Sequence, residues 1–93
     1  DIGYTPTKFM LCQNYPNPFN PTTRITFAIP QAGHTTVKIF NTMGQVVATL
    51  IDNVVASGEH SVDWSAMNIP SGVYFYRMQT DNYSETKKLL LLK

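Results

Sequence analysis

Apolar and polar residues alternate along most of this 93-residue chain, and turn-forming residues interrupt the alternation roughly every ten positions. Alternation with a period of two buries one face of a strand and leaves the other face in water, as in antiparallel sheets. The pattern predicts seven strands, at residues 9–13, 22–29, 35–41, 46–51, 59–64, 73–80 and 83–92. This density of short strands favours an all-β fold, a seven-stranded antiparallel immunoglobulin-like β-sandwich.

Residues 14–21 interrupt this pattern with the sequence NYPNPFNP. Proline lacks a backbone N–H donor and has a fixed φ, so such a segment does not fit inside a sheet. We therefore expect a rigid, extended loop that crosses from one sheet to the other, and call it the Asn-Pro loop.

The strand at 59–64 places His60, Val62 and Trp64 on one face, which makes Trp64 the predicted anchor of the core. Truncation of Trp64 to alanine is expected to unfold the domain. Further aromatic residues follow on two successive strands, at Tyr74, Phe75, Tyr76 and Tyr83. They can fill the core or form an exposed platform for sugar rings, and a small sandwich favours the core.

The size and composition of the chain limit the functions that it can have. The length fits one domain, and 43% apolar residues leave little room for a deep pocket. Charged residues make up only 14% and the net charge is +1, which argues against a nucleic-acid partner. Cys12 is the only cysteine, so no intrachain disulfide or cysteine-based zinc site can form, and we interpret it as a small buried apolar residue.

The chemically active residues do not converge in the sequence. His34 and His60 are not at metal-ligand spacing, and Glu59 and Asp63 fall on an outward strand face. We therefore predict no enzyme activity and no metal site or cofactor, although a calcium-binding loop stays open as an alternative. No stretch is apolar for long enough to form a membrane-spanning helix.

Three blocks of sequence resemble the type A form of the C-terminal sorting domain of the type IX secretion system. They are NYPNPFNPTTRITFAIP at 14–30, VKIFNTMGQVVATL at 37–50 and SGVYFYRMQTDNYSETKKLLLLK at 71–93. Between them, SGEHSVDWSA at 57–66 is similar to a pattern that this family shares with the flagellar hook-cap immunoglobulin-like module. The chain departs from the family at Asn41, Gln45 and Ser65-Ala66, which are turn positions.

The resemblance implies a non-catalytic domain that directs a larger cargo across the bacterial outer membrane. The implied partners are the outer-membrane translocon and sortase components of type IX secretion and a covalently linked N-terminal cargo. The route implied is through the periplasm to the cell surface or the extracellular space. Because the chain also begins without Met, we interpret residues 1–8 as a linker remnant and 9–93 as the sorting domain.

The resemblance also implies a set of sorting residues. They are Pro16, Asn17, Pro18, Phe19, Gly44, Gly72, Tyr74, Lys87, Lys88 and Lys93. For the terminal lysines we hypothesise that the last hairpin offers unpaired backbone and positive charge to a receptor strand. An edge-strand homodimer through the apolar residues 89–92 is a related expectation. The alternative function is a carbohydrate-binding or spacer module of a secreted hydrolase.

Overall fold

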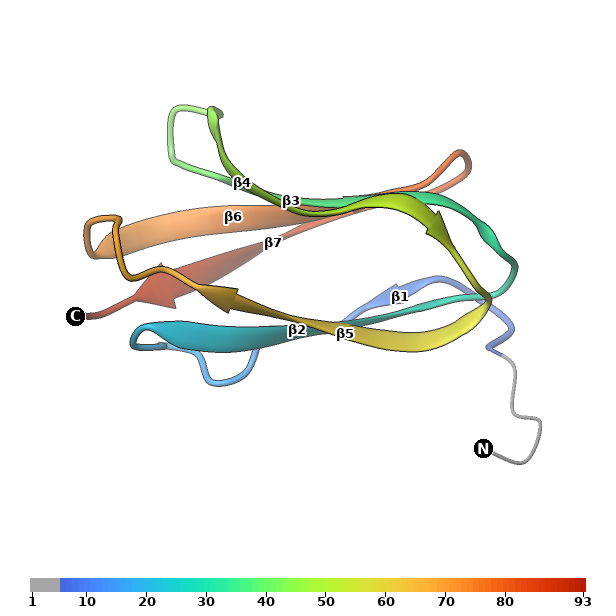
Figure 1. The fold of residues 1–93 in the computed structure, drawn as a ribbon, viewed down its shortest axis with the longest axis horizontal. Coiled ribbons are helices and arrows are strands. Elements are labelled where there is room, and N and C mark those ends of the chain that lie inside the picture. Colours follow the sequence, from blue (N-terminus) through green and yellow to red (C-terminus); the bar gives the residue numbers. More distant parts are fainter. Residues whose placement is uncertain (1–5) are drawn as a thin grey trace.

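Two antiparallel sheets pack face to face in a computed structural model, which describes residues 6–93 (Figure 1). The strands are β1 (Met10–Leu11), β2 (Thr22–Ile29), β3 (Gly33–Phe40), β4 (Val46–Val55), β5 (Gly58–Ser65), β6 (Gly72–Gln79) and β7 (Ser84–Leu91). One sheet has the order β1-β2-β5, and the other has the order β4-β3-β6-β7. The predicted seven-stranded β-sandwich is thereby confirmed.

The core lies between the sheets and is filled by alternate residues of the strands. The pattern is clearest in β2 and β6, where every second side chain is buried. Trp64 is buried, as predicted, and packs against the rings of Phe19 and Tyr74. Tyr74 and Tyr76 also belong to the core, which confirms the core interpretation for these two aromatic residues and leaves no row of exposed rings on β6.

Three predicted strands, β1, β3 and β4, differ from the observed strands by two residues or more at one end. β1 has two residues instead of five, while β4 continues four residues beyond the predicted end at Ile51. The extension forms because Asn53, Val54 and Val55 pair with the start of β3, which itself begins at Gly33, inside the predicted turn. Polar residues are tolerated there because β4 is an edge strand whose side chains are largely exposed.

A buried tyrosine links the two sheets. The Tyr76 hydroxyl group donates to the carbonyl of Cys12 at 2.6 Å and accepts from the backbone N–H of Asn14 at 2.9 Å. Burial raises the pKa of Tyr76 to about 12. Cys12 is only partly buried, contrary to expectation, because it follows the short β1 at the edge of its sheet. Most of the predicted linker at 1–8 lies outside the described residues.

Candidate functional site

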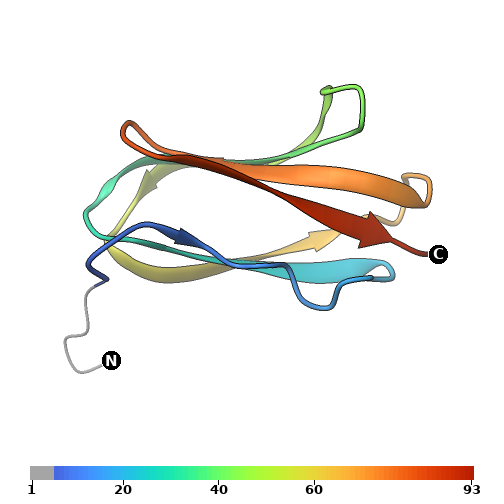
Figure 2. The ribbon, with the colours of Figure 1, turned by 180° about the vertical axis from the view of Figure 1, so that it is seen from behind.

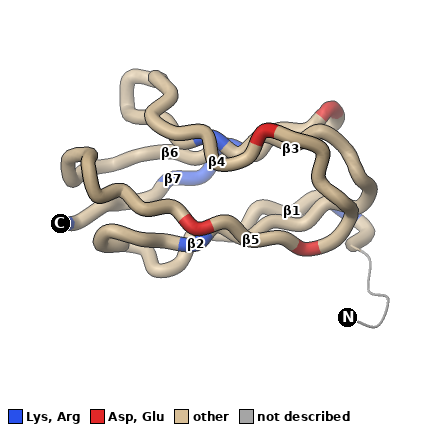
Figure 3. The backbone as a smooth tube through the Cα atoms, in the orientation of Figure 1, with Lys and Arg blue, Asp and Glu red and all other residues tan. Residues whose placement is uncertain are grey.

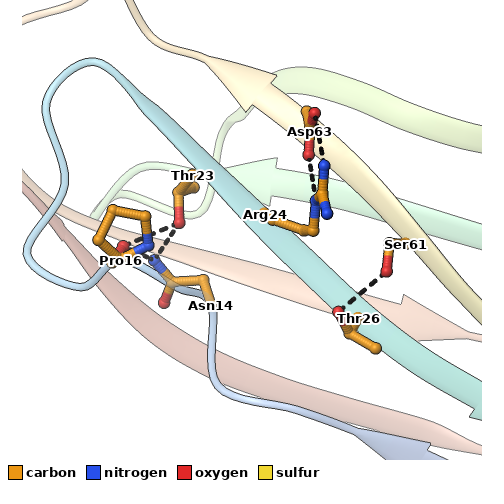
Figure 4. A network of polar contacts seen from close by, with 7 residues as sticks. All are labelled: Asn14, Pro16, Thr23, Arg24, Thr26, Ser61 and Asp63. Atoms are coloured by element: carbon orange, nitrogen blue, oxygen red, sulfur yellow. Dashed lines mark hydrogen bonds and ion pairs between the residues drawn. The ribbon is translucent and has the colours of Figure 1, made fainter.

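The Asn-Pro loop is held at its start by a buried amide (Figure 4). Asn14 is 2% exposed, and its Nδ2 donates to Thr23 Oγ1 at 2.9 Å and to the carbonyl of Pro16 at 3.2 Å. Thr23 Oγ1 donates to the same carbonyl at 2.9 Å. These bonds satisfy polar groups that would be costly to bury unpaired, so they fix the path of the loop as it leaves β1.

The loop then crosses from one sheet to the other, as predicted. Tyr15 exchanges two backbone hydrogen bonds with Arg24 of β2, at 3.0 and 2.9 Å. Four residues later, the Phe19 N–H donates to the carbonyl of Leu90, and its carbonyl accepts from the N–H of Leu92, both at 3.0 Å. The Phe19 ring is buried against Trp64, with the ring centroids 5.7 Å apart.

Side chains of the loop region bind the same edge of β7. Asn17 Oδ1 accepts from the N–H of Leu90 at 3.0 Å, and Gln13 Nε2 donates to the carbonyl of Lys88 at 2.8 Å. The view from behind shows the loop and β7 on one side of the sandwich (Figure 2). The loop therefore occupies backbone groups at the end of β7 that would otherwise be available to another strand.

This arrangement corrects the expectation of an open, apolar C-terminal edge. Leu89 and Leu91 are fully buried because strand alternation points them into the core. Leu92 is half exposed, but its N–H is already bonded to Phe19. Receptor pairing along the whole of β7, as hypothesised from the sequence, would require the loop to be displaced. The homodimer through this edge stays a prediction, subject to the same requirement.

Gly44 sits in the tight turn between β3 and β4, as expected. Its φ of 82° is in the left-handed region that favours glycine. Asn41 Oδ1 accepts from the N–H groups of Met43 and Gln45, at 2.9 and 3.0 Å. The side-chain oxygen of Asn41 therefore stabilises the turn, although Asn41 is one of the positions at which the chain departs from the family.

The C-terminus is tied to the loop between β5 and β6. Lys93 donates from its backbone N–H to Ser71 Oγ at 2.9 Å and from Nζ to the carbonyl of Met67 at 2.6 Å. Tyr74 donates to the carbonyl of Pro70 in the same loop at 2.7 Å. Gly72, with a φ of 151°, starts β6 opposite Leu91.

Most of the predicted sorting residues therefore meet at one end of the sandwich, which we call the sorting end. It contains the Asn-Pro loop, the end of β7, the loop before β6 and the β3–β4 turn (Figure 1). Lys87 and Lys88 lie further back on β7, where Lys87 Nζ is 3.4 Å from Glu85 Oε2. The opposite end contains Phe9, stacked on Tyr83 with centroids 4.8 Å apart, and the β2–β3 and β6–β7 turns.

The residues that hold the loop were not predicted from the sequence. Gln13, Asn14 and Thr23 fix the loop against β2 and β7. No local pattern marks a buried asparagine, since the residue is normally found at the surface. Of the three asparagines of the loop, Asn14 is buried whereas Asn17 and Asn20 are exposed, and this difference arises only from the tertiary structure.

Two ion pairs and one hydrogen bond between a histidine and an aspartate lie at the surface of residues 6–93. Arg24 Nε is 2.8 Å from Asp63 Oδ1, and this hydrogen bond lowers the pKa of Asp63. Beside the pair, a hollow of about 470 Å³ lies between the outer face of β2 and the Asn-Pro loop. Within these residues no three His, Cys, Asp or Glu side chains gather as a metal site requires. The described part of the chain also contains no helix suited to crossing a membrane.

Comparisons with known proteins agree with this geometry. The family described as the secretion system C-terminal sorting domain matches residues 13–92. A comparison with curated protein sequences finds no match. Among solved structures, the chain is similar to PorZ, described as an essential bacterial surface component of the type IX secretion system of Porphyromonas gingivalis, with a TM-score of 0.62 and 26% identity.

The match to PorZ covers 87% of this chain and 11% of that protein, so the chain spans about a tenth of the PorZ structure. The family match covers every strand except β1, and the three sequence blocks except for Lys93. This chain therefore belongs to the secretion system C-terminal sorting domains, whose members act as the C-terminal signal for type IX secretion.

Proposed function

We propose that the sorting end is the surface by which the type IX machinery recognises this domain. The observation that carries the proposal is the assembly of the Asn-Pro loop with the C-terminal strand. Residues more than 70 positions apart join there through the bonds from Asn17 and Gln13 to β7. A receptor that reads this surface would accept only the folded domain, because the unfolded chain does not bring the two segments together.

The residues proposed for recognition are those that the fold gathers at this end or places along β7. They are Pro16, Asn17, Pro18, Phe19, Gly44, Gly72, Tyr74, Lys87, Lys88 and Lys93. The buried members, Phe19 and Tyr74, would shape the surface from below. The exposed members, among them Asn17 and Lys88, are available for contact.

The proposed partners are the outer-membrane translocon and sortase components and a cargo covalently linked on the N-terminal side. The first described residues lie at the end opposite the sorting end (Figure 1). A cargo attached there would leave the recognition surface free. We further propose that the domain performs no chemistry of its own and passes through the periplasm before reaching the cell surface or the medium.

Secretion of a reporter tests the proposal. Residues 1–93 are fused to a neutral periplasmic reporter in a host with a working type IX system, and cell fractions are compared. The double variant Asn17→Ala, Lys93→Ala removes two contacts at the sorting end without emptying the core. Gln31→Ala, an exposed residue at the opposite end, is the matched control.

We expect export of the unmodified fusion and of the control, and periplasmic retention of the double variant. Thermal unfolding of the isolated domains shows whether the double variant still folds. Equal export of a folded double variant and the control would place recognition elsewhere. Retention of the unmodified fusion would contradict the sorting function for this chain.

A further inference from the structure

The outer face of the four-stranded sheet carries an apolar patch near the sorting end. Phe40 of β3 lies opposite Val46 of β4 on one side and opposite Phe75 of β6 on the other. In the neighbouring pair, Val73 of β6 lies opposite Leu90 of β7. Four of the five alternate with core residues along their strands, and Val46 shares a face with its partner Phe40. All five therefore point away from the core and are partly exposed. We call these five residues the outer patch.

Three cations lie beside the outer patch. Lys38 and Arg77 lie directly opposite each other on β3 and β6, and Lys88 lies opposite Phe75. Basic positions accordingly gather in the middle of this sheet (Figure 3). Like charges directly opposite each other destabilise a strand pair. The sheet thus keeps an arrangement that the fold does not need for its stability.

No carboxylate of residues 6–93 neutralises these cations. Within that range ion pairs join Arg24 to Asp63 and Lys87 to Glu85, and a hydrogen bond joins His34 to Asp52. None of them involves Lys38, Arg77 or Lys88. The described part of the domain therefore offers three cations on one face to an external anion.

Arg77 is oriented for such a contact. Its guanidinium carbon lies 4.6 Å from the centre of the Phe40 ring, and its Nε is 3.4 Å from Thr86 Oγ1. The stacking holds the guanidinium group beside a hollow of about 210 Å³, which Phe40, Gly44 and Phe75 also line. The hollow has aromatic walls and a planar cation at one side, so it fits an apolar side chain with a carboxylate nearby.

We propose that this face docks an acidic protein segment in which carboxylates stand next to apolar side chains. The inference rests on the proposed function, because the partner would be the component of the secretion machinery that reads the sorting end. Charge complementarity selects an anionic partner. The hollow between Phe40 and Phe75 favours a protein over a lipid surface, since a layer of headgroups supplies no single side chain to fill it.

A charge reversal separates docking from folding. Lys38→Glu places an opposite charge across from Arg77, so the fold is expected to unfold at the same temperature as the wild type or higher. The affinity for an acidic segment is expected to fall, because the variant loses a cation and adds a carboxylate that repels the segment. Lys8→Glu makes the same change in net charge outside the face and serves as the control.

The binding probe is a short, end-capped peptide of alternating glutamate and phenylalanine, followed by NMR titration of the whole domain. We expect shifts at Phe40, Phe75 and Arg77, and binding about tenfold weaker or more in Lys38→Glu but unchanged in Lys8→Glu. Shifts confined to other faces, or equal binding by both variants, would overturn the proposal. Binding to anionic phospholipid vesicles without binding to the peptide would also overturn it.

The same two variants are compared in the reporter assay. Loss of export by a stable Lys38→Glu fusion, with export of Lys8→Glu, supports the docking face. Export of both variants would overturn the docking face and leave the sorting function intact. Retention of the unmodified fusion would count against the sorting function instead, and the peptide titration would then decide the docking face alone.

Discussion

The two edges of the four-stranded sheet are protected in different ways. At β7 the Asn-Pro loop bonds to backbone groups of the last residues, and Leu89 and Leu91 are buried. At β4 no strand of the described chain pairs with the outer edge, and Val54 is 70% exposed. Two register irregularities with β3 interrupt β4 instead. Such bulges twist an edge and discourage pairing with other chains.

The comparison shows that the C-terminal strand depends on a distant part of the chain. A hairpin with β6 alone would leave the end of β7 open, whereas the loop closes it through bonds that span more than 70 residues. The β4 edge forms backbone pairs only with its neighbour β3 within the described chain. Damage to the loop should therefore disturb β7 strongly and β4 little.

The largest effect is expected from Phe19→Ala. Phe19 is 2% exposed and contacts both β7 and Trp64, so its truncation should cost about 3–5 kcal/mol of unfolding free energy. Tyr15→Ala in the same loop is the control, because Tyr15 is 80% exposed. Urea unfolding measures both variants. Similar losses in the two would mean that the loop does not anchor through Phe19.

The next largest difference in unfolding free energy is expected between alanine substitutions at the two edges. Leu91→Ala empties a fully buried position in β7 and should cost about 2–5 kcal/mol. Val54→Ala in β4 removes an exposed side chain and should change stability by less than about 0.5 kcal/mol. Thermal unfolding distinguishes them. A large loss at Val54 would show that the β4 edge is buried in solution.

High pH should weaken the contact between the loop region and β6. The pKa of Tyr76 is about 12 in the folded protein and about 10 in an unfolded chain, so the unfolded state releases the proton first. Stability is therefore intact below pH 10 and falls as the pH rises towards 12, by an amount on the order of 2 kcal/mol.

Tyr83, whose hydroxyl group bonds to Glu85, also has a pKa raised to about 12 and acts in the same direction. Denaturant unfolding at several alkaline pH values, with Tyr76→Phe as the comparison, measures the contribution of Tyr76. If the free energy of unfolding falls with pH equally steeply in Tyr76→Phe and in the wild type, groups other than Tyr76 cause the alkaline loss of stability.

The smallest effect should come from Asn17→Ala. The variant loses one hydrogen bond to the Leu90 N–H and should lose about 1 kcal/mol. Amide hydrogen exchange should accelerate at Leu90 and stay the same in β4. Asn20→Ala, which truncates an exposed asparagine of the same loop, is the matched control. Equal exchange rates at Leu90 in both variants would show that the Asn17 side chain does not protect the edge of β7.

Local pattern predicted some elements well and others poorly. β2, β5 and β6 follow their alternating residues, because one face of each strand is buried and the other is not. β4 was predicted too short, since Asp52 and Asn53 interrupt its apolar pattern and pairing with β3 continues across them. The apolar run 89–92 was interpreted as an exposed edge, although two of its four residues are in the core.

The sequence predicted the separate segments of the candidate site but not the contacts that bring them together. The Asn-Pro loop and the Gly44 turn were found because proline and glycine restrict the backbone locally. The roles of Gln13 and Asn14 were not found, and neither was the closeness of Lys38 and Arg77, because these depend on which strands become neighbours. The core interpretation of Tyr74 and Tyr76, which was favoured over a sugar platform, is confirmed because both residues face the other sheet.

Local patterns in the sequence were enough to predict most of the strands, the inward face of most of them and the crossing loop, because alternation, proline and glycine act over a few residues. Folding in three dimensions was needed to show that the loop covers β7, that Tyr76 links the sheets and that three cations share one face. Those features join residues up to 75 positions apart, and their geometry depends on the register and packing of the two sheets.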